Sequence, residues 1–338
     1  MSNRITVKDI AKELDVSLGT VSKALTGKPG ISEDMRRNVT DKALEMGYSV
    51  NRIAQSLSRR QIKLSIVYPS TWSQYYDEII KGMVSAIDLL RDNNVHGEFF
   101  QFSNLYSMQE LSAIIDTVIE IKPDAVVLCP GSVANLGEYA EKLNDHRIGL
   151  ILVGNDISGS KRLCSVRLNA PMAGALAAEF MGCLTAESSS MVILIGDKSH
   201  REHIEKVYAF ENGLDGDRHL VRVIETQDDP DVAVLFTRKL LYEIPDIGGI
   251  YVATGNSLAV CSTLTEFGRT DVPVIATDLF DNILPYMQSR MIRGIIFQDP
   301  VKQGKTAIEV CYRYLTSRKM PKSDIYINPS LLLRSNVL

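Results

Sequence analysis

The chain has 338 residues, of which 45% are hydrophobic and 23% charged, and its formal net charge is -4. At roughly 150 residues per domain, this length favours two or three compact units with sizeable apolar cores. The composition excludes a chain that is polycationic throughout. It also excludes a membrane-spanning helix, because no stretch approaches the necessary run of about 18 apolar residues.

The charges are distributed unevenly along the chain. Residues 1–60 contain 11 Lys and Arg against 7 Asp and Glu, a net charge of +4, so the remainder carries -8. A basic head on an acidic body indicates that the head meets a polyanion. The five cysteines form no CxxC pair and the N-terminus has no apolar run. We therefore expect reduced thiols, no metal site, no signal peptide and a cytoplasmic location.

The first 50 residues are predicted to form three short helices. Only LDVS separates the first two, and so tight a turn favours a residue at positive φ, which Asp15 tolerates better than most residues other than Gly. This spacing is typical of a helix-turn-helix, whose second helix enters the DNA major groove, although an ordinary αα-corner shares it. The residues predicted to begin the three helices and to end the third are Thr6, Ser17, Ser32 and Gly47.

From residue 62 onward, short apolar runs alternate with amphipathic stretches, as in LSIVYP followed by DEIIKGMVSAIDLL. This alternation predicts parallel sheets built from βαβ units. The strands are too many for one sheet of ordinary size, so we predict an all-α head followed by an α/β body of two parallel-sheet lobes. Ligands in such folds bind at the carboxyl ends of strands, here in a cleft between the lobes. We place lobe 1 at about 62–158 and 291–320, and lobe 2 at about 159–290 and 321–338.

The head also resembles a known family. The segment TVKDIAKELDVSLGTVSKALTGKPGISEDMRRNVTDKALEMGYSVNRIAQSLSRR is similar, without a gap, to the head and hinge of the lac repressor family of bacterial transcription regulators. The matching features are the TVSKAL helix, the IS cap, the GY end of the third helix and the IAQSL hinge. The body resembles the family's periplasmic sugar-binding fold more loosely. The resemblance implies a DNA-binding domain at 1–50, a hinge helix or linker at 51–61, and an effector-binding and dimerisation domain at 62–338.

The family pattern implies DNA contacts in the head. Leu18 can contact a thymine methyl, Gly19 lets the backbone approach, and Lys23 can bind guanine or only a phosphate. The family usually has Arg at position 23, so Lys loses the bidentate geometry. The full set of implied base contacts is Leu18, Gly19, Thr20 and Lys23. The positions that match phosphate contacts are Ser17, Ser22, Thr26, Ser32, Tyr48 and Asn51.

The hinge matches the family's minor-groove segment. Leu57 matches the wedge residue, which separates a base step and kinks the duplex. Arg52 and Ala54 match neighbouring minor-groove positions. Because a ten-residue helix is marginal alone in water, we expect it to form only when two copies meet on DNA. A plain tether is the alternative.

The resemblance of the body implies an effector pocket. The segment STWSQYYDEIIKG resembles the first strand-to-helix loop, with Trp72, Tyr75 and Tyr76 as aromatic candidates for a ligand ring, although a tyrosine here can be mere packing. In SHREHIEKV, His203 holds a slot that normally carries an arginine, and Arg201, two residues earlier, is a candidate to replace that arginine in binding the effector. The polar candidates at predicted strand ends, where they bind hydroxyl groups or merely cap the strand, are Asn155, Asp156, Asn256, Asp278 and Gln298.

These features predict a transcription regulator that binds a palindromic operator as a homodimer or a dimer of dimers. We expect repression of carbohydrate-use genes, controlled by a sugar, sugar acid or polyol. A purine co-repressor or a phosphorylated partner protein is the alternative. An enzyme is disfavoured, because QGKTAIE has Asp299 where a phosphate-binding loop needs glycine and no GxGxxG or nucleophile elbow occurs, and no cofactor is expected. A sugar-transport protein would need a secretion signal and has no use for the head.

Overall fold

The computed structural model describes residues 5–26, 28–48, 60–70, 73–103, 108–131, 136–156 and 160–337. The chain divides into two compact units, residues 1–60 and 61–338, and each is described by itself. The predictions for Asn51, Arg52, Ala54, Leu57 and Trp72 lie outside the described residues. Across the ranges given above, no helix is long and apolar enough to cross a bilayer.

The first unit is a domain of three helices, α1 (Val7–Glu13), α2 (Leu18–Thr26) and α3 (Glu33–Glu45). The predicted capping residues begin these helices. The Asp9 carboxylate accepts the Thr6 N–H at 2.7 Å, closing a capping box, and the Ser32 hydroxyl accepts the Met35 N–H at 3.2 Å. These bonds satisfy N–H groups that have no partner inside the helix. The side chains that fill the core of the domain are Ile10, Ala11, Val21, Ala24, Val39 and Ala43.

The turn between α1 and α2 confirms the expectation for Asp15, which adopts a φ of 49°. The Val16 N–H returns to the Ala11 carbonyl at 3.0 Å, so the chain reverses within three residues. Gly47 ends the third helix at a φ of +69°. The two short helices are therefore held at a fixed crossing by local backbone geometry and by the Val21 side chain, which is fully buried between them.

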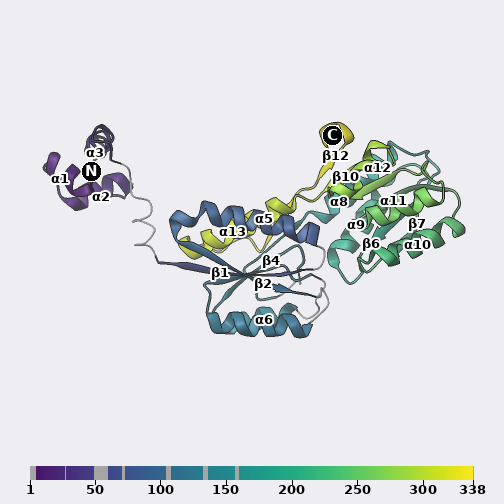
Figure 1. Cartoon of the computed structure of the whole chain (residues 1–338), viewed down its shortest axis with the longest axis horizontal. Helices are drawn as coiled ribbons and strands as arrows, with labels where there is room; N and C mark the ends of the chain where they lie inside the picture. The colour runs from purple at the N-terminus through teal and green to yellow at the C-terminus, as the bar shows by residue number, and fades with distance from the viewer. Residues whose placement is uncertain are drawn as a thin grey trace. The chain divides into compact units, whose positions relative to one another are not determined.

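The second unit contains two six-stranded sheets (Figure 1). The order in the first is β11-β5-β4-β3-β1-β2, with all strands parallel; in the second it is β12-β10-β9-β8-β6-β7, with only β12 antiparallel, to β10. The predicted fold class is confirmed. The strands are β1 (Ile62–Pro69), β2 (Val95–Phe102), β3 (Ala125–Leu128), β4 (Gly149–Val153), β5 (Cys164–Leu168), β6 (Ser190–Ile195), β7 (His219–Glu225), β8 (Ile247–Val252), β9 (Val274–Thr277), β10 (Ile292–Phe297), β11 (Asp324–Ile327) and β12 (Ser330–Leu332).

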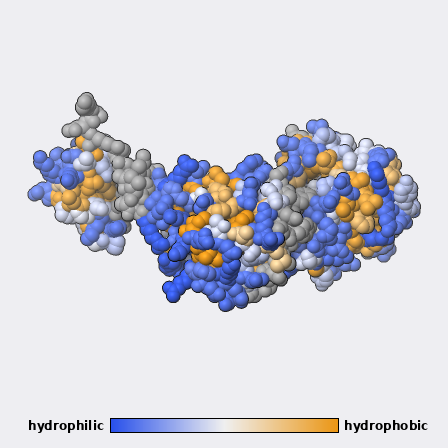
Figure 2. Space-filling model, turned by 60° about the horizontal axis from the view of Figure 1, so that its bottom comes forward, coloured by the Kyte–Doolittle hydropathy of each residue, from blue (hydrophilic) through white to orange (hydrophobic). Residues whose placement is uncertain are grey.

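Helices cover both faces of each sheet. In the first sheet, Ile66 packs towards Ile79 of α5 and Ile308 of α13, whereas its neighbour Val67 packs towards Ile115 of α6. Hydrophilic residues occupy most of the face seen in Figure 2, because the apolar runs are enclosed between these layers. The body helices are α5 (Ser73–Leu89), α6 (Met108–Ile121), α7 (Leu136–Asp145), α8 (Ala170–Gly182), α9 (Arg201–Gly213), α10 (Pro230–Glu243), α11 (Ser257–Glu266), α12 (Leu284–Gln288), α13 (Pro300–Ser317) and α14 (Arg334–Val337), with short 3-10 turns at Arg91–Asn93 and Asp281–Ile283.

The predicted lobe boundaries are wrong at three strands. β5 and β11 pair with each other in the first sheet although both were expected in lobe 2, and β10 lies in the second sheet although it was expected in lobe 1. The chain therefore passes between the sheets after β5, after β10 and after β11. β5 and β10 are largely buried and carry an apolar pattern that fits either sheet. β11 is a short edge strand in which only Ile327 is buried, so its composition does not assign it to a sheet either.

Helices α5 and α13 approach each other through two glycines. A Cβ atom on Gly82 would lie 2.0 Å from the Val301 carbonyl oxygen, and one on Gly304 would lie 2.0 Å from the Ile79 carbonyl oxygen. Real Cβ atoms do not approach backbone this closely, so each position requires glycine for the observed spacing. This contact places α13 directly behind the pocket residues on α5.

Candidate functional sites

The first turn of α2 presents the residues predicted to contact bases. The Leu18 side chain is 49% exposed, and Gly19 and Lys23 are exposed as well, whereas Thr20 is partly buried. The Thr20 hydroxyl lies 2.9 Å from that of Ser17, whose oxygen also accepts the Thr20 N–H at 3.1 Å. A large apolar side chain at an open helix start contributes little to the domain core, so this surface is available to a partner.

The predicted phosphate contacts fall into two groups. Ser17, Ser22 and Ser32 are exposed, and the hydroxyl oxygens of Ser17 and Ser32 accept helix N–H groups. The Ser17 hydroxyl also shares a hydrogen bond with that of Thr20. Tyr48 is partly buried against the head core. The Thr26 side chain lies outside the described residues.

Arg36 on α3 holds the C-terminal end of α2, a role that the sequence analysis missed. Its guanidinium donates to the carbonyls of Lys23 at 3.1 Å, Ala24 at 3.3 Å and Lys28 at 2.9 Å. A cation at a helix C-terminus satisfies carbonyls that lack partners within the helix. Arg36 therefore fixes the orientation of α2 on the rest of the head.

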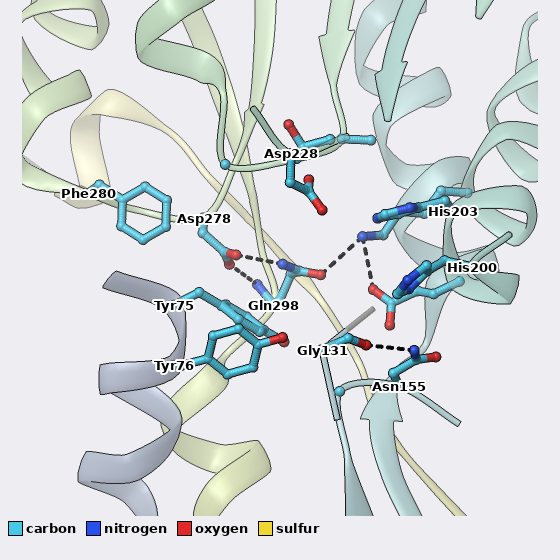
Figure 3. Close-up of a pocket in the computed structure, with 16 residues that line it drawn as sticks. Tyr75, Tyr76, Gly131, Asn155, His200, His203, Asp228, Asp278, Phe280 and Gln298 are labelled. Carbon is cyan, nitrogen blue, oxygen red and sulfur yellow. Dashed lines mark hydrogen bonds and ion pairs between the residues drawn. The ribbon is translucent and has the colours of Figure 1, made fainter. Parts of the chain in front are cut away.

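A pocket in the body lies where strands of both sheets end (Figure 3). It brings together six of the predicted residues, which come from α5, α9 and the segments after β4, β9 and β10. Their contact with an effector stays a prediction. The predicted residues that line the pocket are Tyr75, Tyr76, Asn155, His203, Asp278 and Gln298; the others are Gly131, Gly154, His200, Glu202, Lys206, Asp228, Ala253, Thr254, Gly255 and Phe280.

Three predicted pocket residues do not line it. Asp156 instead makes a bidentate ion pair with Arg162, with both side chains buried. Arg201 has a side chain that is 53% exposed and binds Glu205, so it does not replace the usual pocket arginine. The buried Asn256 donates to the Thr226 hydroxyl at 3.0 Å. Adjacent residues in a strand-end segment point in different directions, and the sequence pattern does not determine which one faces the ligand.

Among the described residues that line this pocket, the one with a cationic side chain is Lys206, which was not predicted from the sequence. Its side chain is 2% exposed, and its ammonium group lies 3.0 Å from Glu202 Oε1 and 3.1 Å from Gln298 Oε1. Burial opposes its charge, but Glu202, Tyr251 and Asp278 together outweigh burial and raise the Lys206 pKa. The i,i+4 spacing of Glu202 and Lys206, one turn from His203, is the signal that could have identified the pair.

Asp278 and Gln298 form a second buried pair of polar side chains. The Gln298 backbone N–H and side-chain amide donate to the two Asp278 oxygens at 3.1 Å and 2.5 Å. Burial raises the Asp278 pKa to about 6, although both hydrogen bonds favour the ionised form. Asp278 itself has a φ of 59°, a conformation uncommon outside glycine. In this conformation of the turn after β9, the Asp278 side chain lines the pocket.

A chain of hydrogen bonds links the Asp278–Gln298 pair to α5. The Gln303 side chain on α13 donates to the Gln298 carbonyl at 3.0 Å, and the Tyr75 hydroxyl donates to Gln303 at 3.3 Å. Tyr75 and Tyr76 contact each other edge to face, with ring centroids 5.4 Å apart. Because Lys206 also binds Gln298, polar contacts extend from α9 beside one sheet to α5 beside the other.

Two histidines, His200 just before α9 and His203 on α9, are held in the neutral form. Their rings stack with centroids 5.3 Å apart, and His203 Nδ1 lies 3.0 Å from the Asp197 backbone nitrogen. Burial lowers the pKa of His200 and lowers that of His203 to about 3, with Lys206 adding to the effect on His203. The slot that normally carries an arginine therefore holds an uncharged ring.

We expect His203→Asn to remove part of the acid sensitivity of the body. Wild-type His203 stays neutral when folded but takes up a proton near pH 6.5 when unfolded. Stability from this residue is therefore lost as pH falls below 6.5, by about 1.4 kcal/mol per pH unit. Asparagine keeps a polar atom near Asp197 and does not titrate. Other titrating groups are common to both proteins and cancel in the difference.

Urea unfolding followed by circular dichroism at pH 5, 6, 7 and 8 measures this effect. The difference in free energy of unfolding between wild type and variant should be constant from pH 7 to 8. Below pH 6.5 this difference should change in favour of the variant. A difference that stays constant down to pH 5 would contradict the neutral buried assignment of His203.

Comparisons with known proteins agree with this division of the chain. Residues 6–51 match the family described as bacterial regulatory proteins, lacI family, and residues 64–319 match the periplasmic binding protein domain. Catabolite control protein A from Priestia megaterium is 21% identical over 333 residues, covering 96% of both chains. The HTH-type transcriptional regulator RegA from Clostridium saccharobutylicum is 38% identical over 77 residues, covering 22% of this chain and 23% of the relative.

Solved structures share the fold of the body. A solute binding protein of an ABC transporter from Burkholderia graminis, in complex with D-arabinose, has a TM-score of 0.75 at 21% identity, covering 82% of this chain and 97% of its own. A protein described as a LacI transcriptional regulator from Bacteroides fragilis has a TM-score of 0.71 at 19% identity, covering 82% and 99%. The chain belongs to the periplasmic binding protein domain family and carries, at its N-terminal end, the DNA-binding domain of the lacI family of bacterial regulatory proteins.

Proposed function

We propose that this protein is an operator-binding transcription regulator whose DNA affinity changes when a carbohydrate enters the pocket of the body. The observation that carries the proposal is the presence, in one chain, of a helix-turn-helix with an exposed first turn in α2 and a polar, aromatic-lined pocket. A protein that only transported sugars would not use the head. The protein acts by binding, in the cytoplasm, rather than by catalysis.

The pocket chemistry supports a ring ligand with several hydroxyl groups. Carboxylates can accept two hydroxyl protons and an amide can both donate and accept, while Tyr75, Tyr76 and Phe280 offer apolar faces to a ring. D-arabinose in the similar fold from Burkholderia graminis is in line with this ligand class. Among the rival effectors, a purine would also use the aromatic faces, and a phosphorylated partner protein would not need the pocket.

Leu18 and Lys23 are proposed to contact bases, and Ser17, Ser22 and Ser32 to contact phosphates. A single head of this size reads one half-site, so we propose a homodimer on a palindromic operator. Effector binding would alter the relation of the two heads and relieve repression. Such couplings amount to about 1–3 kcal/mol, or 5- to 150-fold in operator affinity.

The test is to select operators from genomic fragments with the full chain and then titrate the selected duplex by fluorescence anisotropy, with and without each effector candidate. We expect Lys23→Ala to relax base preference at one position in each half-site, because the base-edge hydrogen bond is lost. Asp278→Asn should abolish the effector response while leaving DNA affinity unchanged.

The outcomes separate the parts of the proposal. An affinity loss for Lys23→Ala that is uniform across sequences would make Lys23 a phosphate contact. If operator affinity changes only with purines, or only with a phosphorylated protein, that partner rather than a carbohydrate is the effector. Absence of any sequence-selective DNA binding would overturn the regulator assignment itself.

A further inference from the structure

The pocket wall carries an unbalanced set of charges. Among its described lining residues, the carboxyl groups of Glu202, Asp228 and Asp278 face one ammonium group, that of Lys206, and no arginine is present. With these three carboxyl groups and this ammonium group ionised, the wall has a formal excess of two negative charges. A ligand that enters this space meets a field that favours positive charge and opposes carboxylate or phosphate groups.

Lys206 is already committed to partners inside the protein. Its ammonium group binds Glu202 at 3.0 Å and Gln298 at 3.1 Å, and its side chain is 2% exposed. An anionic ligand would have to break a buried ion pair to reach it, leaving Glu202 without its cation, which is costly. Lys206 therefore balances Glu202 and is a poor site for a ligand anion.

The two remaining carboxyl groups differ in their partners. Asp278 accepts one hydrogen bond at each oxygen from Gln298. Asp228 receives no hydrogen bond from any of the residues that the structure describes, and its side chain lies on the pocket wall beside His203 (Figure 3). Burial raises the Asp228 pKa to about 6, against the effect of Lys206. Asp228 is thus a desolvated acid that lacks a counter-charge of its own.

The backbone directs this carboxyl group into the pocket. Gln227 and Asp228 have consecutive positive φ values of 52° and 55°, a conformation that costs free energy for residues other than glycine and is concentrated at functional sites. The Gln227 N–H binds the Gly196 carbonyl at 2.8 Å and the Asp229 N–H binds the Thr226 carbonyl at 2.9 Å, so the turn is fixed on both sides. A strained, anchored turn holds an unpaired acid at the ligand space.

We propose that the effector is a hydroxyl-bearing ring with a protonated amino group, an amino sugar or an aminocyclitol, whose ammonium group binds Asp228. This inference rests on the proposed function and narrows its ligand class, and it excludes sugar acids and sugar phosphates. Phe280 and the two tyrosines of α5 hold the ring, and an aromatic face also attracts the cation. The ammonium group supplies Asp228 with the charge partner that the protein itself does not provide.

The experiment is isothermal titration of the full chain at pH 7.5 with matched probes. D-glucosamine and D-galactosamine are compared with D-glucose and D-galactose, with the two N-acetyl derivatives, and with glucuronate and galacturonate. We expect one amine to bind at least tenfold more tightly than its parent sugar and its N-acetyl derivative, and the uronates not to bind. In Asp228→Asn the amine should lose this preference while the parent sugar keeps its affinity.

Asparagine tolerates the left-handed backbone at position 228, so this variant is expected to fold. Glu225→Gln is the matched control, because Glu225 binds Lys198 outside the pocket lining, and it should keep the preference for the amine. Equal or tighter binding of a neutral sugar or a uronate would overturn the inference and leave the proposed function in place. If no probe binds and none changes operator affinity, the carbohydrate-controlled function fails as well.

Discussion

Replacing Lys206 with methionine is expected to destabilise the body by about 3–5 kcal/mol, because it leaves Glu202 charged and buried without its cation. Glu202 is 14% exposed at its side chain, so water can compensate only in part. The Gln298 side-chain oxygen also loses its donor. Urea unfolding of the full chain at pH 7.5, followed by circular dichroism, measures the loss.

The double variant Lys206→Met/Glu202→Gln is the matched control. Removing the stranded charge should recover most of the lost stability, since replacing both members of a buried pair is often close to neutral. A single variant within 1 kcal/mol of wild type would mean that Glu202 becomes protonated or rehydrated at little cost. That result would contradict the view of Lys206 as the internal counter-ion of the pocket.

Gly304→Ala is the second substitution with a large expected effect, a loss of about 3 kcal/mol. The added methyl group would lie 2.0 Å from the Ile79 carbonyl oxygen, so α13 must move away from α5. Such a movement opens the apolar core that Ile79 and Ile308 share and displaces Gln303, the link between Tyr75 and Gln298. Effector affinity should therefore fall together with stability.

Gly137→Ala is the control for a glycine-to-alanine change within a helix. Position 137 lies in α7, where an added methyl group would meet no described atom within 4 Å. This variant should be neutral or more stable by up to about 1 kcal/mol, because alanine reduces the entropy of the unfolded chain. Both variants are compared by thermal and urea unfolding. Equal stability of the two would show that α5 and α13 separate easily.

Several of these residues were identified by their local sequence and several were not. The strand-end rule brought Asn155, Asp278 and Gln298 to one pocket, because the carboxyl ends of parallel strands share one edge of a sheet. The same rule placed Asp156 there, yet its side chain binds Arg162. Adjacent residues after a strand project in different directions, and an ion pair elsewhere in the fold decided which of the two faced inward.

Short-range order is what the sequence by itself determined. Caps at Thr6 and Ser32, the positive φ of Asp15 and the alternation of buried runs with helices depend on residues a few positions apart, so the head and the fold class follow from them. Only the tertiary structure decided which sheet receives β5, β10 and β11, and that Lys206 rather than Arg201 supplies the cation of the pocket. The strand assignment depends on partners distant in the chain, because the composition of a short strand does not assign it to one of two similar sheets. Lys206 has its acid partner Glu202 one turn away on α9, but it becomes an internal counter-ion only because distant residues such as Gln298 enclose it.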